Sequence, residues 1–224
     1  MDHFSFLSFE SSYRKGIARW RTRLVALVLF LVFSSATAAE SRIVFLGDSL
    51  TAGYGLNPEE AYPALLERRL QDEGIEVTVI NAGVSGDTSA GGLSRINWVL
   101  GRPTDVLVVA LGGNDGLRGL PTTALAKNLT AIIEKARARY PDITIILAGM
   151  QMPASMGKEY QESFAAVYPT VADATDVVLI PFLLNGVAGD PDLNLADRIH
   201  PNKEGQIIIA ETVWPYLETV FAKE

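Results

Sequence analysis

The 224-residue chain contains no cysteine. This absence excludes disulfide bonds, thiol catalysis, zinc sites built on thiolates and membrane anchors attached through a lipidated cysteine. It does not exclude an oxidising compartment, because a chain of this length with 48% hydrophobic residues buries a core without covalent cross-links.

Basic residues are scarce outside the N-terminal region. Residues 1–39 hold five of the 19 Lys and Arg residues but only two of the 26 Asp and Glu residues. Residues 40–224 therefore carry 14 basic and 24 acidic residues, a net charge of −10. An acidic domain without a basic run is a poor candidate for binding nucleic acid or an anionic membrane surface. We expect no nucleic-acid partner and a soluble domain.

The N-terminal region lacks an apolar run of the about 20 residues that a comfortable membrane span needs. Its apolar run, Leu24–Phe33, has ten residues, follows five basic residues and precedes the small residues Ser34–Ala39. This order is typical of a cleavable signal peptide. We predict a signal peptide over 1–39, cleaved after Ala38 or Ala39, and a periplasmic or secreted domain over 40–224 without a stable membrane anchor. An uncleaved signal anchor is the alternative.

The rest of the chain alternates apolar, β-branched runs with amphipathic segments. The runs predict strands at 43–46, 77–80, 105–111, 143–148 and 176–180, and the segments predict helices at 58–73, 90–100, 121–140, 158–173 and from Pro201 onward. This alternation predicts a parallel sheet with helices on both faces. Right-handed crossovers then favour a doubly wound α/β fold, a three-layer sandwich in one domain.

A serine directly follows the first predicted strand. Gly47 breaks this strand, and Asp48 and Ser49 lie where the chain turns out of the sheet. Open α/β sheets bind ligands at this carboxyl edge. A serine hydroxyl is a poor nucleophile, so Ser49 would need a base, an orienting acid and donors for an oxyanion.

Histidine is also scarce, with only His3 and His200 in the chain. His3 lies in the predicted signal peptide, so His200 is the only imidazole available to the mature domain. Asp197 precedes it by three residues, a spacing that can bring a carboxylate to the ring. These two residues are therefore candidates for acid and base. Alternatively, Asp197 and His200 cap a helix that opens at Pro201.

Oxyanion donors are expected from three loops at the same sheet edge. The candidates are the backbone N–H groups of Ser49 and Gly83 and the side-chain amide of Asn114. Taken singly, Gly83 and Asn114 also suit ordinary turns.

Asp48, Asp87 and Asp115 suit loop capping better than a metal cluster, so we expect no metal. Six apolar residues near the site favour a lipophilic acyl chain, although at least half suit an ordinary core: Leu117, Leu120, Met150, Met152, Phe182 and Leu183.

Four segments in order resemble the signature blocks of the SGNH (GDSL-type) hydrolase family: Gly47–Leu50, Asn81–Gly83, Gly112–Asp115 and Asp197–Pro201. The resemblance covers essentially all of residues 42–220. It implies a flavodoxin-like five-stranded sheet, with Ser49 as nucleophile, His200 as base and Asp197 as orienting acid. It also implies an oxyanion hole from Ser49, Gly83 and Asn114, without metal or cofactor.

The longer strings around these blocks are similar to one bacterial periplasmic branch of the family, which comprises acyl-CoA thioesterases, proteases, lysophospholipases and arylesterases. This similarity implies a secreted serine esterase of lipid metabolism that hydrolyses lysophospholipids, aryl esters and acyl-CoA. A deacetylase acting on O-acetylated carbohydrates is the alternative enzyme. A catalytically idle module that binds acyl or glycan ligands is the alternative from another class.

Overall fold

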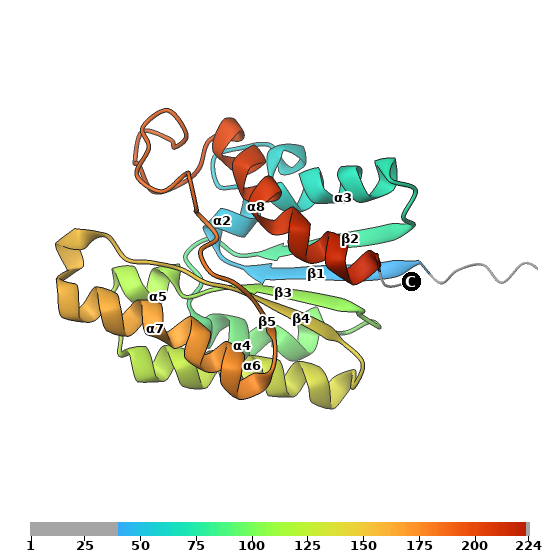
Figure 1. Ribbon diagram of the computed structural model, residues 1–224, viewed down its shortest axis with the longest axis horizontal. Helices are drawn as coiled ribbons and strands as arrows, with labels where there is room; N and C mark the ends of the chain where they lie inside the picture. The colour runs from blue at the N-terminus through green and yellow to red at the C-terminus, as the bar shows by residue number, and fades with distance from the viewer. Residues whose placement is uncertain (1–39, 223–224) are drawn as a thin grey trace, which may run out of the picture. The chain divides into compact units, whose positions relative to one another are not determined.

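Five parallel strands form one sheet in the order β2-β1-β3-β4-β5 (Figure 1). The computed structural model describes residues 40–222, so the predicted signal peptide lies outside the described residues. The strands are β1 (Ser41–Gly47), β2 (Val77–Gly83), β3 (Val106–Ala110), β4 (Thr144–Ala148) and β5 (Val178–Ile180). The five predicted strands and their parallel pairing are confirmed.

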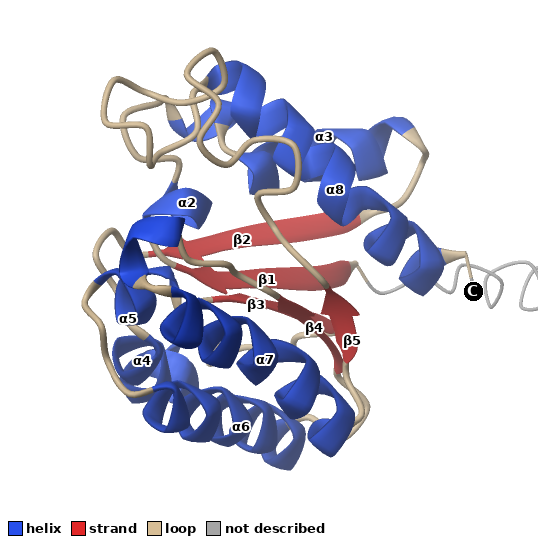
Figure 2. Cartoon of the chain, turned by 60° about the vertical axis from the view of Figure 1, so that its left-hand side comes forward, coloured by secondary structure: helices blue, strands red, loops and turns tan. Residues whose placement is uncertain are grey.

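Helices cover both faces of this sheet. Those in the described part of the chain are α2 (Ser49–Ala52), α3 (Tyr62–Asp72), α4 (Ser89–Val99), α5 (Gly113–Leu117), α6 (Thr122–Arg139), α7 (Lys158–Thr175) and α8 (Lys203–Phe221). Two short 3-10 helices span Pro58–Glu60 and Ala154–Met156. Helices α3 and α8 pack together on one face, and α4, α6 and α7 form the layer on the other (Figure 2). The predicted three-layer α/β sandwich is confirmed.

The core lies between these layers because the central strands are apolar on both sides. Every residue of β3 is buried, as are the last five residues of β1. Helix α6 presents one apolar stripe to the sheet, with buried residues at helical spacing: Leu125, Leu129, Ile132, Ile133 and Ala136. A strand that is buried on both faces has a continuous apolar run in its sequence, and this is why these strands could be predicted from the sequence.

The strand order creates a crevice at the carboxyl edge of the sheet. Strand β1 lies between β2 and β3, so the chain passes to one side after β1 and returns to the other side with β3. Loops that follow β1 and β3 therefore diverge, which is where open α/β sheets place ligands. The short helices α2 and α5 lie at this edge (Figure 2).

Three predicted boundaries near this edge were wrong. Helix α8 begins at Lys203 rather than Pro201, because the Asn202 side chain caps it by accepting a hydrogen bond from the Gly205 N–H at 3.0 Å. Strand β2 extends to Gly83, which therefore ends a strand instead of lying in a loop. The chain after β3 forms α5 instead of a loop, so Asn114 lies in the first turn of a helix.

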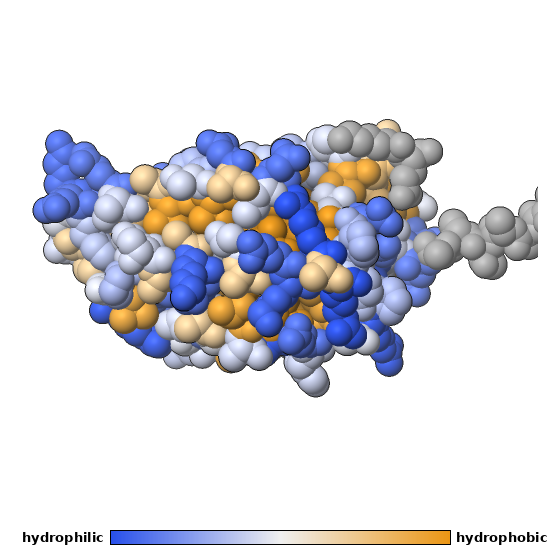
Figure 3. All heavy atoms as spheres, turned by 90° about the horizontal axis from the view of Figure 1, so that it is seen from below, coloured by the Kyte–Doolittle hydropathy of each residue, from blue (hydrophilic) through white to orange (hydrophobic). Residues whose placement is uncertain are grey.

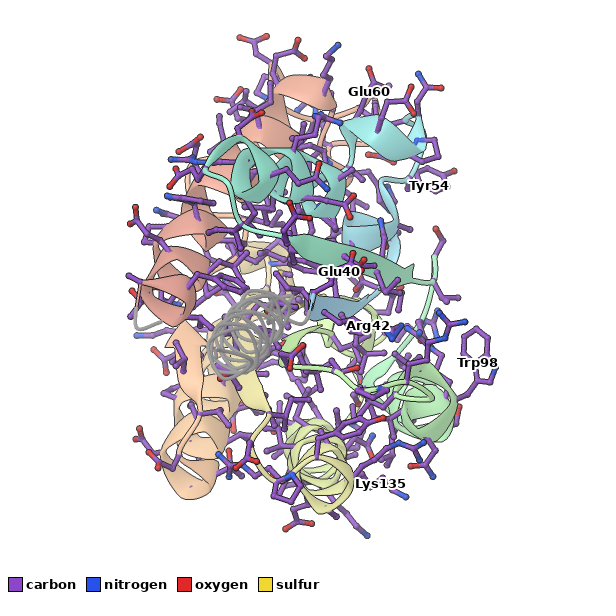
Figure 4. The ribbon with its side chains drawn as sticks, turned by 90° about the vertical axis from the view of Figure 1, so that its right-hand side faces the viewer. Glu40, Arg42, Tyr54, Glu60, Trp98 and Lys135 are labelled. Carbon is purple, nitrogen blue, oxygen red and sulfur yellow. The ribbon has the colours of Figure 1, made fainter. Side chains whose placement is uncertain are left out.

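The outer surface mixes hydrophilic and hydrophobic residues, as Figure 3 shows for the side of the molecule below the sheet in Figure 1. Trp98 is 83% exposed and projects away from α4 (Figure 4). Among residues 40–222, no helix combines the length and apolar character needed to cross a bilayer.

Candidate active site

The turn from β1 into α2 sets the position of Ser49. Gly47 is required at the strand end, because a Cβ there would lie 2.0 Å from Oγ1 of Thr51. Asp48 caps α2, with its Oδ1 accepting a hydrogen bond from the Leu50 N–H at 3.0 Å. Ser49 is the first residue of α2, where a backbone N–H has no partner within the helix. Its hydroxyl and its N–H are thus held together at the carboxyl edge of the sheet.

His200 connects Ser49 to Asp197. Its Nε2 lies 2.9 Å from Oγ of Ser49, and its Nδ1 lies 2.6 Å from Oδ2 of Asp197. A hydrogen on Nδ1 donates to the carboxylate and leaves Nε2 able to accept the serine proton. The imidazole of His200 is therefore within hydrogen-bonding distance of both Ser49 and Asp197, so the three side chains form one continuous chain of contacts. Neither His200 nor Asp197 caps α8, so the alternative that they form a helix cap is wrong.

The carboxylate of Asp197 is held in place by three hydrogen bonds. Its Oδ1 accepts the N–H groups of Ile199 at 2.9 Å and His200 at 3.0 Å, while Oδ2 faces the imidazole. Hydrogen bonds from the His200 backbone, the His200 ring and the Ile199 backbone lower the pKa of Asp197 to about 2. Asp197 is therefore ionised at neutral pH and suited to orient an imidazole and balance its charge.

A second carboxylate, that of Asp48, belongs to the residue before Ser49 and lies in a different environment. Burial raises its pKa to about 6, although the hydrogen bonds from Leu50 and Asn114 and the charge of His200 act in the opposite direction. Asp48 is only 2% exposed to solvent. Asp48 therefore links the start of α2 to α5 as an internal acceptor.

The three candidate oxyanion donors differ in whether their hydrogens are already engaged in hydrogen bonds. The amide of Asn114 uses one hydrogen to reach Oδ2 of Asp48 at 3.3 Å, so its second hydrogen is available. The N–H of Gly83 donates to Oδ1 of Asn81 at 3.0 Å, and a Cβ at Gly83 would lie 2.3 Å from the backbone nitrogen of Ala52. Gly83 is thus packed directly behind α2, but its N–H is engaged.

A cavity of about 430 Å³ opens beside Ser49, His200 and Asn114. Most of its wall is apolar and comes from α5, the loop after β4 and the irregular chain after β5: Leu117, Met150, Met152, Pro153, Phe182, Leu184, Ala188 and Ile199. Four of the six predicted acyl-site residues are among its lining, whereas Leu120 is not and Leu183 is fully buried core. Gly83 lies outside the lining.

Sequence reasoning missed two residues beside His200. The ring of Tyr54 lies against the imidazole, with centroids 4.4 Å apart and ring planes inclined by 36°, and Arg198 lines the cavity. Tyr54 comes from the chain after α2, so no local pattern relates it to His200. The left-handed backbone of Arg198 is likewise invisible in the sequence.

The other two aspartates considered for a metal cluster, Asp87 and Asp115, accept hydrogen bonds from neighbouring residues. Asp115 accepts the N–H of Ser89 at 2.8 Å and its hydroxyl at 2.6 Å, and Asp87 pairs with Nε of Arg95 at 2.8 Å. Within residues 40–222, no group of three or more His, Cys, Asp or Glu side chains is arranged to hold a metal.

Residues 45–207 match the family described as GDSL-like Lipase/Acylhydrolase. Esterase TesA of Pseudomonas aeruginosa is 42% identical over 199 residues, which cover 88% of this chain and 98% of that protein. Arylesterase of Vibrio mimicus is 38% identical over 192 residues, covering 85% of this chain and 95% of that protein. Thioesterase 1/protease 1/lysophospholipase L1 of Escherichia coli is 39% identical over 198 residues, covering 88% and 91%.

The backbone is similar as well. A crystal structure of TesA superposes with a TM-score of 0.77 at 42% identity, covering 80% of this chain and 99% of that chain. The similarity in sequence and in backbone therefore extends over nearly the whole described part of the chain.

Proposed function

The chain belongs to the GDSL-like Lipase/Acylhydrolase family and is a serine hydrolase acting on ester bonds, and on that premise we propose that Ser49, His200 and Asp197 are its catalytic triad. The observation that carries this proposal is the continuous contact from Oγ of Ser49 through the imidazole to the Asp197 carboxylate, at 2.9 and 2.6 Å. Such a contact chain gives a serine both a base and an oriented ring.

The proposed reaction is acyl transfer in two steps. Oγ of Ser49 attacks the acyl carbonyl while Nε2 of His200 takes its proton, and the resulting imidazolium is stabilised by Asp197. Collapse of the tetrahedral intermediate breaks the ester bond, and His200 returns the proton to the leaving group. Water then repeats the sequence on the acyl-enzyme and releases the acid and Ser49.

The negative charge on the tetrahedral oxygen needs fixed donors. We assign this role to the N–H of Ser49, the free amide hydrogen of Asn114 and the N–H of Gly83. Asn114 supports the assignment best, because it lines the cavity and is anchored by Asp48. Gly83 contributes only when its N–H is shared with, or released from, Oδ1 of Asn81.

The substrates proposed for this site are carboxylic esters and thioesters with a lipophilic acyl chain, such as lysophospholipids, aryl esters and acyl-CoA. The apolar wall of the 430 Å³ cavity supports an acyl chain longer than acetyl. The names of the relatives, which include an arylesterase and a thioesterase/lysophospholipase, support the same classes. A deacetylase of carbohydrates would be better served by polar walls.

Hydrolysis of p-nitrophenyl esters of graded acyl length tests this proposal, with Ser49→Ala measured beside the unsubstituted domain. We expect activity that extends to medium or long chains and is lost in the variant. Activity confined to acetate would instead indicate the deacetylase. Equal activity in both proteins would remove Ser49 from the mechanism, and no burst with any activated ester would leave an idle binding module.

We further propose that the chain is exported and loses residues 1–39. The support is the order of a basic segment, a ten-residue apolar run and small residues in the sequence. The N-terminal sequence of the protein recovered from the periplasm of a bacterial host is expected to begin at Ala39 or Glu40. Retention of the basic segment would identify an uncleaved anchor.

A further inference from the structure

Arg198 lies between the proposed acid and the proposed base with an unusual backbone. Its φ is 56°, in the left-handed region, and within residues 40–222 only Asp176 shares this property among residues other than glycine. A side chain at such a position is strained, whereas glycine is not. Strained residues persist where their surroundings or their function require them, and they concentrate at ligand sites.

Arg198 is exposed and lines the cavity, and its guanidinium has no hydrogen-bond or ion-pair partner in the described part of the chain. Only its backbone N–H is engaged, with the Leu195 carbonyl at 2.8 Å. By contrast, Arg95 pairs with Asp87, and Arg118 donates to the Gly86 carbonyl. Arg198 is also the only lysine or arginine that lines the cavity, in a domain with a net charge of −10.

The position of Arg198 relative to His200 indicates which end of a substrate it meets. Because His200 delivers a proton to the leaving group, that group departs on the imidazole side of Ser49. Arg198 is two residues from His200 in the same loop, and both residues line the same cavity. The Tyr54 ring also contacts His200, with ring centroids 4.4 Å apart.

We propose that Arg198 binds a phosphate carried by the leaving group, in a substrate whose phosphate is one glycerol unit away from the ester. The proposal rests on the function proposed above and names the substrate class: single-chain acyl glycerophosphates, with an anionic headgroup. A guanidinium binds phosphate through two parallel hydrogen bonds, which a lysine cannot reproduce. Arg198 thus sets the preference among esters with the same acyl chain.

The test compares two substrates that share an acyl chain, 1-decanoyl-glycerol 3-phosphate and 1-decanoylglycerol. The measured quantity is the ratio of their kcat/KM values. Arg198→Gln is expected to lower this ratio by about tenfold, as the loss of one charge-assisted pair implies, and Arg198→Lys by a smaller factor. Arg102→Gln is the matched control, because Arg102 is exposed in the loop before β3, at the opposite edge of the sheet, and its loss should leave the ratio unchanged.

An unchanged ratio in Arg198→Gln would overturn the proposal, as would an equal loss on both substrates, which would indicate a structural role. Decanoyl-CoA distinguishes the source of the phosphate, since its phosphates lie far from the thioester. A loss for decanoyl-CoA without a loss for the glycerophosphate would overturn the short spacing. Failure of the proposed function itself is separate: activity on 1-decanoylglycerol would then survive in Ser49→Ala.

Discussion

The side-chain amide of Asn114 donates a hydrogen bond to Oδ2 of Asp48 across 3.3 Å. Because Oδ1 of the same carboxylate caps α2 through the Leu50 N–H, Asp48 connects the helix that carries Ser49 to the helix that carries Asn114. The proposed nucleophile and the best-placed of the proposed oxyanion donors are thus connected by a single buried side chain.

Asn114→Ala should lower kcat for a p-nitrophenyl ester by about 10²–10³, the usual cost of one oxyanion donor. The change should have little effect on thermal unfolding, because Asn114 is only partly buried and its bond to Asp48 is long. Steady-state kinetics and the Tm of the same preparation provide the check. Turnover close to that of the unsubstituted enzyme would exclude Asn114 from the oxyanion hole.

Asp48 should make the stability of the fold depend on pH. Its pKa is about 6 in the folded protein and 3.8 in an unfolded chain, so the folded state binds the proton more tightly. Stability from this group is therefore present at low pH and decreases as pH rises from about 4 to about 7, by on the order of 3 kcal/mol.

Asp48→Asn isolates this effect, since it cannot ionise. The difference in unfolding free energy between the unsubstituted protein and the variant should become less favourable to the unsubstituted protein as pH rises through that range. Chemical denaturation at pH 4, 5.5 and 7 measures it. A difference that is constant with pH would mean that Asp48 titrates alike in both states.

Gly83→Ala should impair both folding and catalysis. The new Cβ would lie 2.3 Å from the nitrogen of Ala52 and 2.8 Å from the carbonyl of Asp48, so α2 would have to move. We expect a loss of about 1–3 kcal/mol in stability and about a hundredfold loss in turnover, because Ser49 moves with the helix. Gly101→Ala is the comparison, since its Cβ meets only the Trp98 carbonyl, and it should retain turnover.

Tyr54 should support the imidazolium that forms during acyl transfer. Its ring lies 4.4 Å from the His200 ring, a distance at which an aromatic face attracts a cation. Tyr54→Ala is expected to reduce kcat/KM by about two- to fivefold. Tyr54→Phe keeps the ring and should behave like the unsubstituted enzyme; an equal loss in both variants would implicate the hydroxyl group instead.

The strands, and the contacts among Ser49, His200 and Asp197, could be predicted from the sequence because their signals are local. The runs at β1 and β3 are largely apolar, and a single histidine outside residues 1–39 left one candidate base. The spacing of Asp197 and His200 also proved sufficient to bring their side chains into contact.

The boundaries that were wrong depend on pairing and capping. Asn81 and Gly83 look like turn residues, but they pair in register with Phe45 and Gly47 of β1, and this pairing prevails over turn propensity. Similarly, Pro201 suits a first helical position, but the capping side chain of Asn202 starts α8 later. The contact between the Tyr54 and His200 rings brings together residues that are far apart in the sequence, so no local pattern predicts it.

Ser49 and His200 are 151 residues apart in the chain, yet their side chains are in contact. The first strand and the last loop must both reach their final positions before His200 lies near Ser49. Formation of this contact requires closure of a long loop, which costs entropy and favours slow folding. Recovery of esterase activity after denaturation should therefore report that both ends of the domain have folded, and a chain in which either end is unfolded should not hydrolyse esters.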